Sequence, residues 1–224
     1  VGTMEWIVAI LFLFSLLHLF LFSLGQLHLT FIYLRKALPP GLQQTDDFMP
    51  VVTVQLPVYN EKYVVERLID AVAQLNYPRE KLDIQILDDS TDETSGIIYQ
   101  KLEWLKRFDI HMHHIRRPNR KGYKAGALEV GLAEAKGDFI AIFDSDFIPD
   151  PDFLRKTLPY FTKESIGAVQ TRWGHINAEY SMITRLQAFG LDAHFSIEQS
   201  ARNAAGSFIN FNGTSGIWRK RCIT

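Results

Sequence analysis

Two aspartates stand two residues apart in a polar stretch that follows an apolar run. Asp144 and Asp146 come after Phe-Ile-Ala-Ile-Phe at 139–143, which has the composition of a buried strand. Side chains at positions i and i+2 of a strand share one face, so we expect both carboxylates to point the same way. Close carboxylates repel each other unless a cation neutralises them, and Mg²⁺ is often held by one or two carboxylates together with substrate phosphates. The pair therefore predicts a site for a divalent metal and a diphosphate, against the alternative of a solvated, Asp-rich turn.

Polar, acid-rich segments also follow two other predicted strands. The strand 51–56 leads into Pro-Val-Tyr-Asn-Glu at 57–61, and the strand 82–87 leads into Asp-Asp-Ser-Thr-Asp at 88–92. From residue 51 onward strand patterns alternate with helical ones, which predicts a Rossmann-like, doubly wound and mainly parallel α/β sheet. Ligands of such sheets bind beyond the carboxyl ends of the strands. We therefore expect the three polar strand ends to meet at one edge and form a ligand site.

The periodicity of apolar residues gives the full set of expected elements. The expected strands are 51–56, 82–87, 110–115, 139–143 and 166–170, and the expected helices are 64–75, 94–108, 125–135, 153–161 and 182–200.

The N-terminal segment is far more apolar than the rest of the chain. Residues 6–24 carry no charge, and only two serines and one histidine among them are polar. A helix of about 19 residues spans roughly 28 Å, close to the hydrocarbon thickness of a bilayer. No basic region precedes it, which disfavours a signal peptide, and it lacks the polar face of a buried core helix. We predict a transmembrane helix, and Arg35 and Lys36 after it predict a domain that faces the cytoplasm.

Composition excludes other classes of protein and of site. The 24 basic and 25 acidic residues do not suggest a nucleic-acid binder dominated by phosphate contacts. The single cysteine, Cys222, allows no internal disulfide. The histidines at 111, 113 and 114 lie on a predicted strand, where alternate residues face opposite sides, so we expect no metal site there. For Arg116, Arg117 and Lys121 we expect solvated positions in a basic loop.

Four short motifs occur in a fixed order along the predicted sheet domain. They read Leu-Pro-Val-Tyr-Asn-Glu at 56–61, Leu-Asp-Asp-Ser-Thr-Asp at 87–92, Lys-Ala-Gly-Ala-Leu at 124–128 and Phe-Asp-Ser-Asp at 143–146. Their order and spacing resemble those of the family-two inverting glycosyltransferases, which include the cellulose, chitin and hyaluronan synthases. Two further stretches, at 170–177 and 211–219, resemble the cellulose-synthase-like branch that contains the plant mannan synthases. The fold implied is that of the nucleotide-diphospho-sugar transferases.

The resemblance implies roles for individual residues. Asp88 and Asp89 would lie where the family contacts the base and ribose of a nucleotide sugar, with Asp89 as the direct contact, and Lys124 would bind the diphosphate or the sugar. Asp144 and Asp146 would hold Mg²⁺ or Mn²⁺ that bridges the diphosphate. The predicted substrate-binding residues are Pro57, Tyr59, Glu61, Asp88, Asp89, Lys124 and Asp144, and the predicted metal ligands are Asp144 and Asp146.

The function implied is that of a membrane-bound inverting hexosyltransferase. It would move glucose or mannose from a UDP- or GDP-sugar to a growing β-glycan; the alternatives are a lipid acceptor or a donor-binding module without activity. In the family the catalytic base follows the segment that resembles 211–219, so we expect the base beyond Thr224 and this chain to be C-terminally incomplete and inactive. The expected organisation is a transmembrane helix with its flank at 1–36, a linker at 37–49 and a glycosyltransferase domain at 50–224. Asn-Gly-Thr at 212–214 matches a glycosylation acceptor, which a cytoplasmic domain would not use.

Overall fold

The computed structural model describes residues 2–35 and 48–223. These residues form two compact units. One unit contains the N-terminal helix together with residues 172–210, and the other contains the sheet, built from residues before 172 and after 210. Most of the predicted linker at 37–49 lies outside the described residues.

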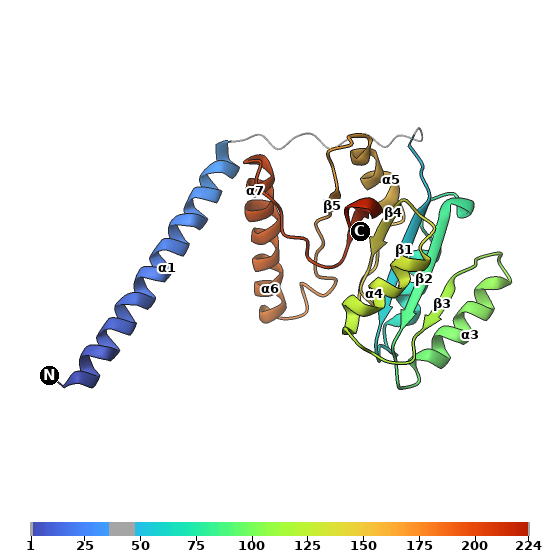
Figure 1. Ribbon diagram of the computed structural model, residues 1–224, viewed down its shortest axis with the longest axis horizontal. Helices are drawn as coiled ribbons and strands as arrows, with labels where there is room; N and C mark the ends of the chain where they lie inside the picture. Colours follow the sequence, from blue (N-terminus) through green and yellow to red (C-terminus); the bar gives the residue numbers. More distant parts are fainter. Residues whose placement is uncertain (1, 36–47, 224) are drawn as a thin grey trace. The chain divides into compact units, whose positions relative to one another are not determined.

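The second unit is built on a six-stranded sheet in the order β3-β2-β1-β4-β6-β5, of which β1 to β5 are labelled in Figure 1. Its strands are β1 (Val52–Val58), β2 (Leu82–Asp88), β3 (His113–Arg116), β4 (Phe139–Ile142), β5 (Ala168–Gln170) and β6 (Gly216–Arg219). The first four strands pair in parallel, whereas β6 runs antiparallel to both β4 and β5. The expected doubly wound, mainly parallel sheet is therefore confirmed.

The strand β6 is absent from the sequence-based expectation. Its four residues, Gly-Ile-Trp-Arg at 216–219, contain too few positions to show an alternating pattern, and in the sequence they stand out only as part of a family motif. The strand adds to the sheet by pairing Ile217 with Ala141 of β4 and Val169 of β5. Long-range pairing, rather than local periodicity, makes this segment a strand.

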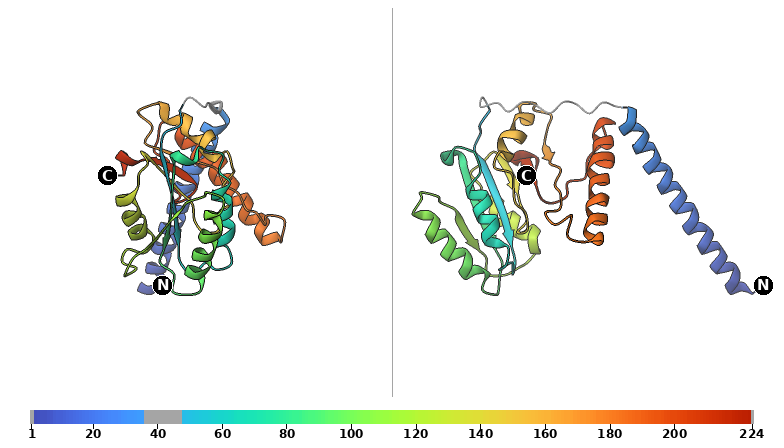
Figure 2. Two further views of the ribbon diagram at one scale, coloured as in Figure 1. Left: turned by 90° about the vertical axis from the view of Figure 1, so that its right-hand side faces the viewer. Right: turned by 180° about the vertical axis from the view of Figure 1, so that it is seen from behind.

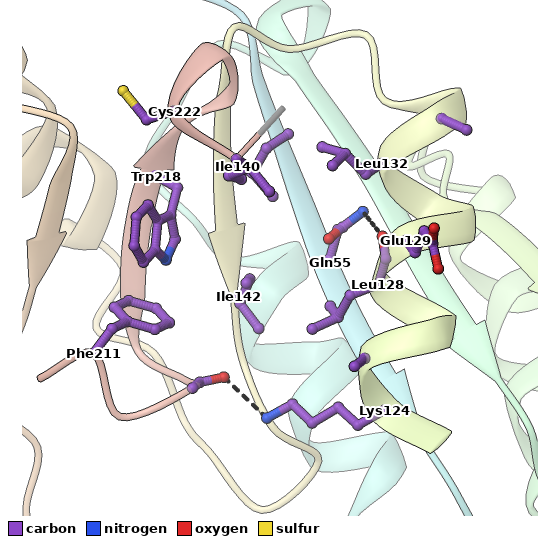
Figure 3. A pocket seen from close by; sticks show the side chains of 14 residues that line it. Gln55, Lys124, Leu128, Glu129, Leu132, Ile140, Ile142, Phe211, Trp218 and Cys222 are labelled. Carbon is purple, nitrogen blue, oxygen red and sulfur yellow. Dashed lines mark hydrogen bonds between the residues drawn. The ribbon is translucent and has the colours of Figure 1, made fainter. Parts of the chain in front are cut away.

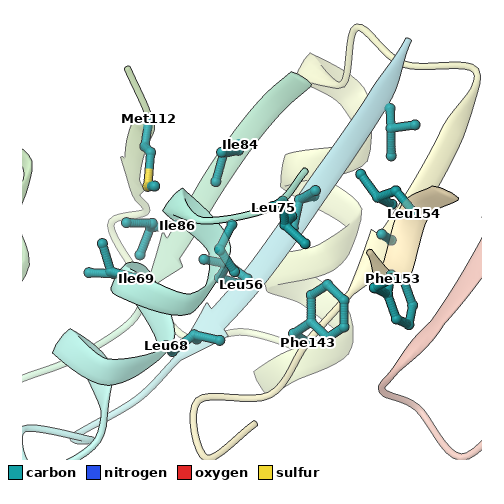
Figure 4. Packing of buried hydrophobic residues seen from close by; sticks show 14 of the residues in the cluster. Leu56, Leu68, Ile69, Leu75, Ile84, Ile86, Met112, Phe143, Phe153 and Leu154 are labelled. Atoms are coloured by element: carbon teal, nitrogen blue, oxygen red, sulfur yellow. The ribbon is translucent and has the colours of Figure 1, made fainter. Parts of the chain in front are cut away.

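One face of the sheet is covered by α2 (Val65–Ala73), α3 (Thr94–Lys106) and α5 (Phe153–Thr157), with α2 and α3 visible on the opposite side from α4 in Figure 2. Alternate residues of β1 point into this core, and Leu56 of β1 and Ile86 of β2 pack beside Leu68 of α2 (Figure 4). Complete burial of a leucine or isoleucine side chain contributes about 1.5–3 kcal/mol. The packing of this cluster fixes the strands β1 and β2, and so the positions of the polar residues at their carboxyl ends.

The other face is covered by α4 (Tyr123–Glu134). A polar layer lies between the helix and the sheet, because Gln55 of β1 donates from Nε2 to Gln85 Oε1 at 3.1 Å and Thr53 donates to Asp83 at 2.8 Å. Gly131 allows the close approach, since a Cβ at this position would lie 2.6 Å from Gln55 Nε2.

The first unit contains α1 (Thr3–Arg35), none of whose residues is buried. Among the described residues it is the one helix that is long and apolar enough to cross a membrane, judged by length and composition. The predicted helix at 182–200 is α6 (Met182–Ala193), which continues through a π-helical segment (His194–Gln199) into α7 (Ser200–Ala204). Short 3-10 turns elsewhere cover Arg79–Lys81, Leu158–Thr162 and Lys220–Cys222.

Candidate functional site

A cavity of about 420 Å³ opens at the carboxyl ends of β1, β2 and β4. The three polar strand ends do meet there, as the sequence predicts. Its walls include seven of the eight predicted site residues: Pro57, Tyr59, Glu61, Asp89, Lys124, Asp144 and Asp146. Four acidic and two basic side chains line it, which gives a formal charge of −2. Two of these carboxylates are already paired with cations, Asp89 with Arg117 and Asp144 with Lys124.

The ends of β1 and β2 are joined by Asn60. Its backbone N–H donates to Ser90 Oγ at 3.0 Å, and its side-chain oxygen accepts from the backbone N–H of Thr91 at 2.9 Å. Asn60 adopts a left-handed conformation with φ of 56°, which asparagine tolerates better than most residues. These bonds hold Tyr59 and Asp89 on adjacent walls of the cavity.

Asp88 is placed differently from its neighbour Asp89. It is 1 % exposed and does not line the cavity. Its carboxylate accepts hydrogen bonds from the backbone N–H of Ser90 at 2.8 Å and from Ser95 Oγ at 2.6 Å, and His114 Nε2 lies 2.9 Å away. Burial by itself would raise its pKa, but the hydrogen bonds from His114, Ser95 and Ser90 lower the pKa of Asp88 to about 2. Asp88 therefore supports the turn, and Asp89 is left to face a ligand.

The histidines at 111, 113 and 114 each lie beside an aspartate. His114 pairs with Asp88, and His111 and His113 pair with other aspartates. Within residues 2–35 and 48–223 no group of three or more His, Cys, Asp or Glu side chains is placed to hold a metal ion. A cation at Asp144 and Asp146 would thus need further ligands from a bound substrate or water.

Asp144 and Asp146 share the cavity for a reason that differs from the one expected. The strand β4 ends at Ile142, and both aspartates lie in the turn after it, where the N–H of Phe147 donates to Asp144 O at 3.1 Å. The expectation of a common strand face is wrong, because the turn brings the two residues together. Asp144 is half-buried and Asp146 is exposed.

Lys124 connects α4 to this turn. Its Nζ lies 2.5 Å from Asp144 Oδ1 and 2.9 Å from the carbonyl oxygen of Gly213. The residue occupies the first turn of α4, where the helix dipole also favours an anion. Lys124 can therefore neutralise a carboxylate here, or a phosphate when one is bound.

The loop 212–215 contributes to the site, which sequence reasoning missed. The backbone N–H of Asp144 donates to Thr214 Oγ1 at 2.9 Å, and Gln170 accepts from the N–H of Asn212 at 2.9 Å. Gly213 has a φ of 80°, so a glycine suits the position. The only sequence signal is the Asn-Gly-Thr-Ser run at 212–215, which indicates a family motif and matches a glycosylation acceptor but does not indicate a support for Asp144.

Arg120 is a second residue that sequence reasoning left unassigned. Its guanidinium carbon lies 3.3 Å from the centre of the Tyr59 ring, within the range of a cation–π contact. Its buried Nε has no hydrogen-bond partner among the described residues. Arg120 thus brings to the cavity wall a side chain whose Nε has no partner among the described residues.

A larger, mostly apolar cavity of about 950 Å³ adjoins the first (Figure 3). It lies between α4 and the strands β4 and β6, and Leu128 and Leu132 of the helix face Ile140 and Ile142 of β4. The rings of Phe211 and Trp218 meet edge to face at 5.1 Å on its wall. Lys124 lines both cavities.

The fold and the cavity define an α/β protein whose ligand site lies at the ends of parallel strands. Comparison with known families identifies it further: the sequence model of "Glycosyl transferase family 2" matches residues 53–221. The chain therefore belongs to glycosyl transferase family 2, and the predicted resemblance is confirmed.

Curated relatives point to the same branch. The chain is 42% identical over 179 residues to "Glucomannan 4-beta-mannosyltransferase 1" of Oryza sativa subsp. japonica, an alignment that covers 78% of this chain and 34% of the relative. It is 41% identical over 197 residues to the protein of the same name from Cyamopsis tetragonoloba, covering 85% of this chain and 37% of the relative. The similarity to the mannan-synthase-like branch is thus confirmed, and the chain spans about a third of the length of these relatives.

A solved structure supports the fold. The mannosyltransferase PcManGT from Pyrobaculum calidifontis, solved in complex with GDP-Man and Mn²⁺, superposes with a TM-score of 0.70 at 23% sequence identity. The match covers 90% of this chain and 52% of that one. At this identity the likeness shows that the two proteins share a fold.

Proposed function

We propose that this chain binds the nucleotide sugar in a membrane-bound hexosyltransferase that extends a β-glycan with inversion at the anomeric carbon. The observation that carries the proposal is the cavity of about 420 Å³ at the strand ends, which is lined by Asp89, Asp144 and Asp146. A carboxylate such as Asp89 suits a base N–H or ribose hydroxyls, since it accepts hydrogen bonds. The glucomannan mannosyltransferases among the relatives support a hexose donor and a glycan acceptor.

The residues of the turn fit a divalent metal. Asp144 and Asp146 both line the cavity, and carboxylate oxygens are the ligands that Mg²⁺ and Mn²⁺ prefer. A structure of the same fold was solved with Mn²⁺ and GDP-Man. Bound there with the diphosphate, the metal would neutralise charge on the leaving group. Lys124 would contact the same diphosphate from the first turn of α4.

The transfer itself is a single displacement. The acceptor hydroxyl attacks the anomeric carbon, the bond from that carbon to the diphosphate oxygen breaks, and the nucleoside diphosphate leaves. A base must take the proton of the hydroxyl. We assign no residue of this chain to that role, and the expectation that the base lies beyond Thr224 stays a prediction. The expectation that the chain is inactive finds no support in the comparisons, and sugar transfer from labelled donor by this chain would contradict it.

We further propose that α1 anchors the protein in a membrane with the sheet domain in the cytoplasm. Its 33 residues and apolar composition support a span, and Arg35 at its end supports this orientation. Protease protection of sealed membrane vesicles measures this: the domain should be cleaved from the cytoplasmic side only.

Calorimetric titration of the 224-residue chain in detergent with GDP, and separately with UDP, tests donor binding. Binding should require Mn²⁺ or Mg²⁺ and should disappear in Asp144→Ala and in Asp146→Ala. Asp192→Ala, an exposed residue of α6, is the matched control and should bind as the parent does. Metal-independent binding, or binding retained in both variants, would overturn the proposal.

The acceptor is tested by the product. Membranes that contain the protein are incubated with GDP-mannose or UDP-glucose labelled in the sugar, and the products are separated by solvent. Label in an insoluble polymer supports the glycan acceptor. Label that is extracted into chloroform would replace it with a lipid acceptor.

A further inference from the structure

Arg117 lies behind the wall of the donor cavity and is not the solvated loop residue expected from the sequence. Its side chain is only 10 % exposed. The guanidinium forms a two-point pair with Asp89, from Nε to Oδ1 at 2.7 Å and from Nη2 to Oδ2 at 2.5 Å. Arg117 does not itself line the cavity, whereas Asp89 does. Arg117 therefore controls the orientation of a cavity residue from outside the cavity.

The same guanidinium also holds the turn that precedes α4. Its Nη1 donates to the carbonyl oxygen of Lys121 at 2.6 Å, and its Nη2 donates to the carbonyl oxygen of Tyr123 at 2.7 Å. Between these carbonyls the backbone is left-handed twice in succession, with φ of 74° at Gly122 and 49° at Tyr123. A non-glycine residue persists in this conformation only where its surroundings enforce it. The two bonds from Arg117 supply that restraint.

The position of this turn determines where the two basic side chains of the cavity lie. Arg120, stacked on Tyr59, lies within it, and Lys124, bonded to Asp144, follows it directly. One guanidinium thus connects the Asp89 side of the cavity with the Lys124 and Asp144 side. The two sides belong to the ends of β2 and β4, which pair with opposite edges of β1, and Arg117 adds a side-chain connection between them.

We propose that Arg117 is the positioning residue of the donor site, which orients Asp89 for the nucleoside and places Lys124 for the diphosphate. The inference rests on the function proposed above. The pair with Arg117 uses two of about four acceptor positions on the carboxylate of Asp89 and leaves the rest for a ligand. Lysine cannot replace this arrangement, because an ammonium is a point charge that lacks the planar fork.

Gly126 provides an independent way to move the same guanidinium. A Cβ at this position would lie 2.6 Å from Arg117 Nη1 and 2.1 Å from the carbonyl oxygen of Lys121. The methyl group of Gly126→Ala would therefore force both the Lys121 carbonyl and the Arg117 guanidinium to move, without changing the charge of Arg117 or of the cavity. We expect Gly126→Ala to raise the Kd of the nucleotide, as Arg117→Lys does.

The test is titration of the 224-residue chain in detergent with GDP and with UDP at saturating MnCl2. Arg117→Lys should raise the Kd of the nucleotide that binds by about tenfold or more, as expected for the loss of charge-assisted hydrogen bonds. Arg107→Lys, an exposed arginine after α3, is the matched control and should leave the Kd within about twofold. An unchanged Kd in Arg117→Lys would overturn the inference and leave the proposed function standing.

A double-mutant cycle separates positioning from a general loss of stability. Asp89→Asn removes the charge to which Arg117 is paired. The double variant Asp89→Asn/Arg117→Lys should therefore raise the Kd of the nucleotide by less than the product of the two single fold-changes. If the fold-change in Kd of the double variant equals the product of the two single fold-changes, Arg117 does not act through Asp89 and the inference is overturned. If Arg117→Lys shows no cooperative unfolding, Gly126→Ala takes its place, and parent-like binding by that variant overturns the inference. A parent chain that binds neither nucleotide contradicts the proposed function as well.

Discussion

The ammonium of Lys124 lies 2.5 Å from Oδ1 of Asp144, so the proposed metal ligand is paired with a cation from the neighbouring helix. A divalent ion that binds Asp144 must compete with this ammonium for the carboxylate. A diphosphate that arrives with the ion offers Lys124 a new anionic partner. Lys124 should therefore weaken the binding of the metal alone and strengthen the binding of the nucleotide.

Replacement of Lys124 by glutamine should separate these two effects. Mn²⁺ alone should bind Lys124→Gln severalfold more tightly than the parent, because the competing charge is gone. GDP or UDP at saturating Mn²⁺ should bind about tenfold more weakly, since a charge-assisted contact to phosphate is lost. Calorimetry measures both constants, and a change of the same sign in both would contradict the proposed position of the diphosphate.

Thr214→Val should weaken metal-dependent nucleotide binding about three- to tenfold. The hydroxyl of Thr214 accepts the backbone N–H of Asp144 at 2.9 Å, and valine keeps the shape while it removes the acceptor. The control is Thr162→Val, an exposed threonine whose hydroxyl donates to Pro159 O. Equal affinities in the two variants would show that the loop 212–215 does not orient Asp144.

Asp88 should make the free energy of unfolding of the sheet domain depend on pH in the acidic range. Its pKa of about 2 lies below the ordinary value of 3.8, so its contribution to the free energy of unfolding is present above about pH 4 and is lost as the pH falls towards 2. The contribution is on the order of 2 kcal/mol. Urea unfolding at several pH values should show the advantage of the parent over Asp88→Asn shrinking through this window. A difference that stays constant with pH would contradict the assigned hydrogen bonds.

Two glycine substitutions should act in opposite directions on stability. Gly131→Ala places a Cβ 2.6 Å from Gln55 Nε2 and 2.8 Å from Gln85 Oε1, so overpacking should lower the free energy of unfolding by about 1–3 kcal/mol. Gly96→Ala in α3 meets nothing within 4 Å and should raise it by about 0.5–1 kcal/mol through helix propensity. Thermal unfolding in detergent, followed by circular dichroism, distinguishes the two; unchanged or higher stability of Gly131→Ala would argue against the close approach of α4.

The contrast between Asp88 and Asp89 shows where sequence reasoning ends. Asp88 is the last residue of β2 and Asp89 follows it directly in the same motif, and their neighbours in sequence do not separate them. Asp88 turns towards Ser95 and His114, and Asp89 turns towards Arg117. These partners come from later segments, so which carboxylate faces the cavity depends on contacts between distant parts of the chain.

The sequence by itself determined the parallel part of the sheet, the apolar N-terminal helix and the kinds of residue at the strand ends. These features depend on local composition and periodicity, which short segments carry on their own. Only the tertiary structure decided that β6 pairs with β4, that the loop 212–215 supports Asp144, and that Arg117 is buried against Asp89. Such features arise when hydrogen-bonding groups far apart in sequence satisfy one another, and no local pattern of residues records that pairing.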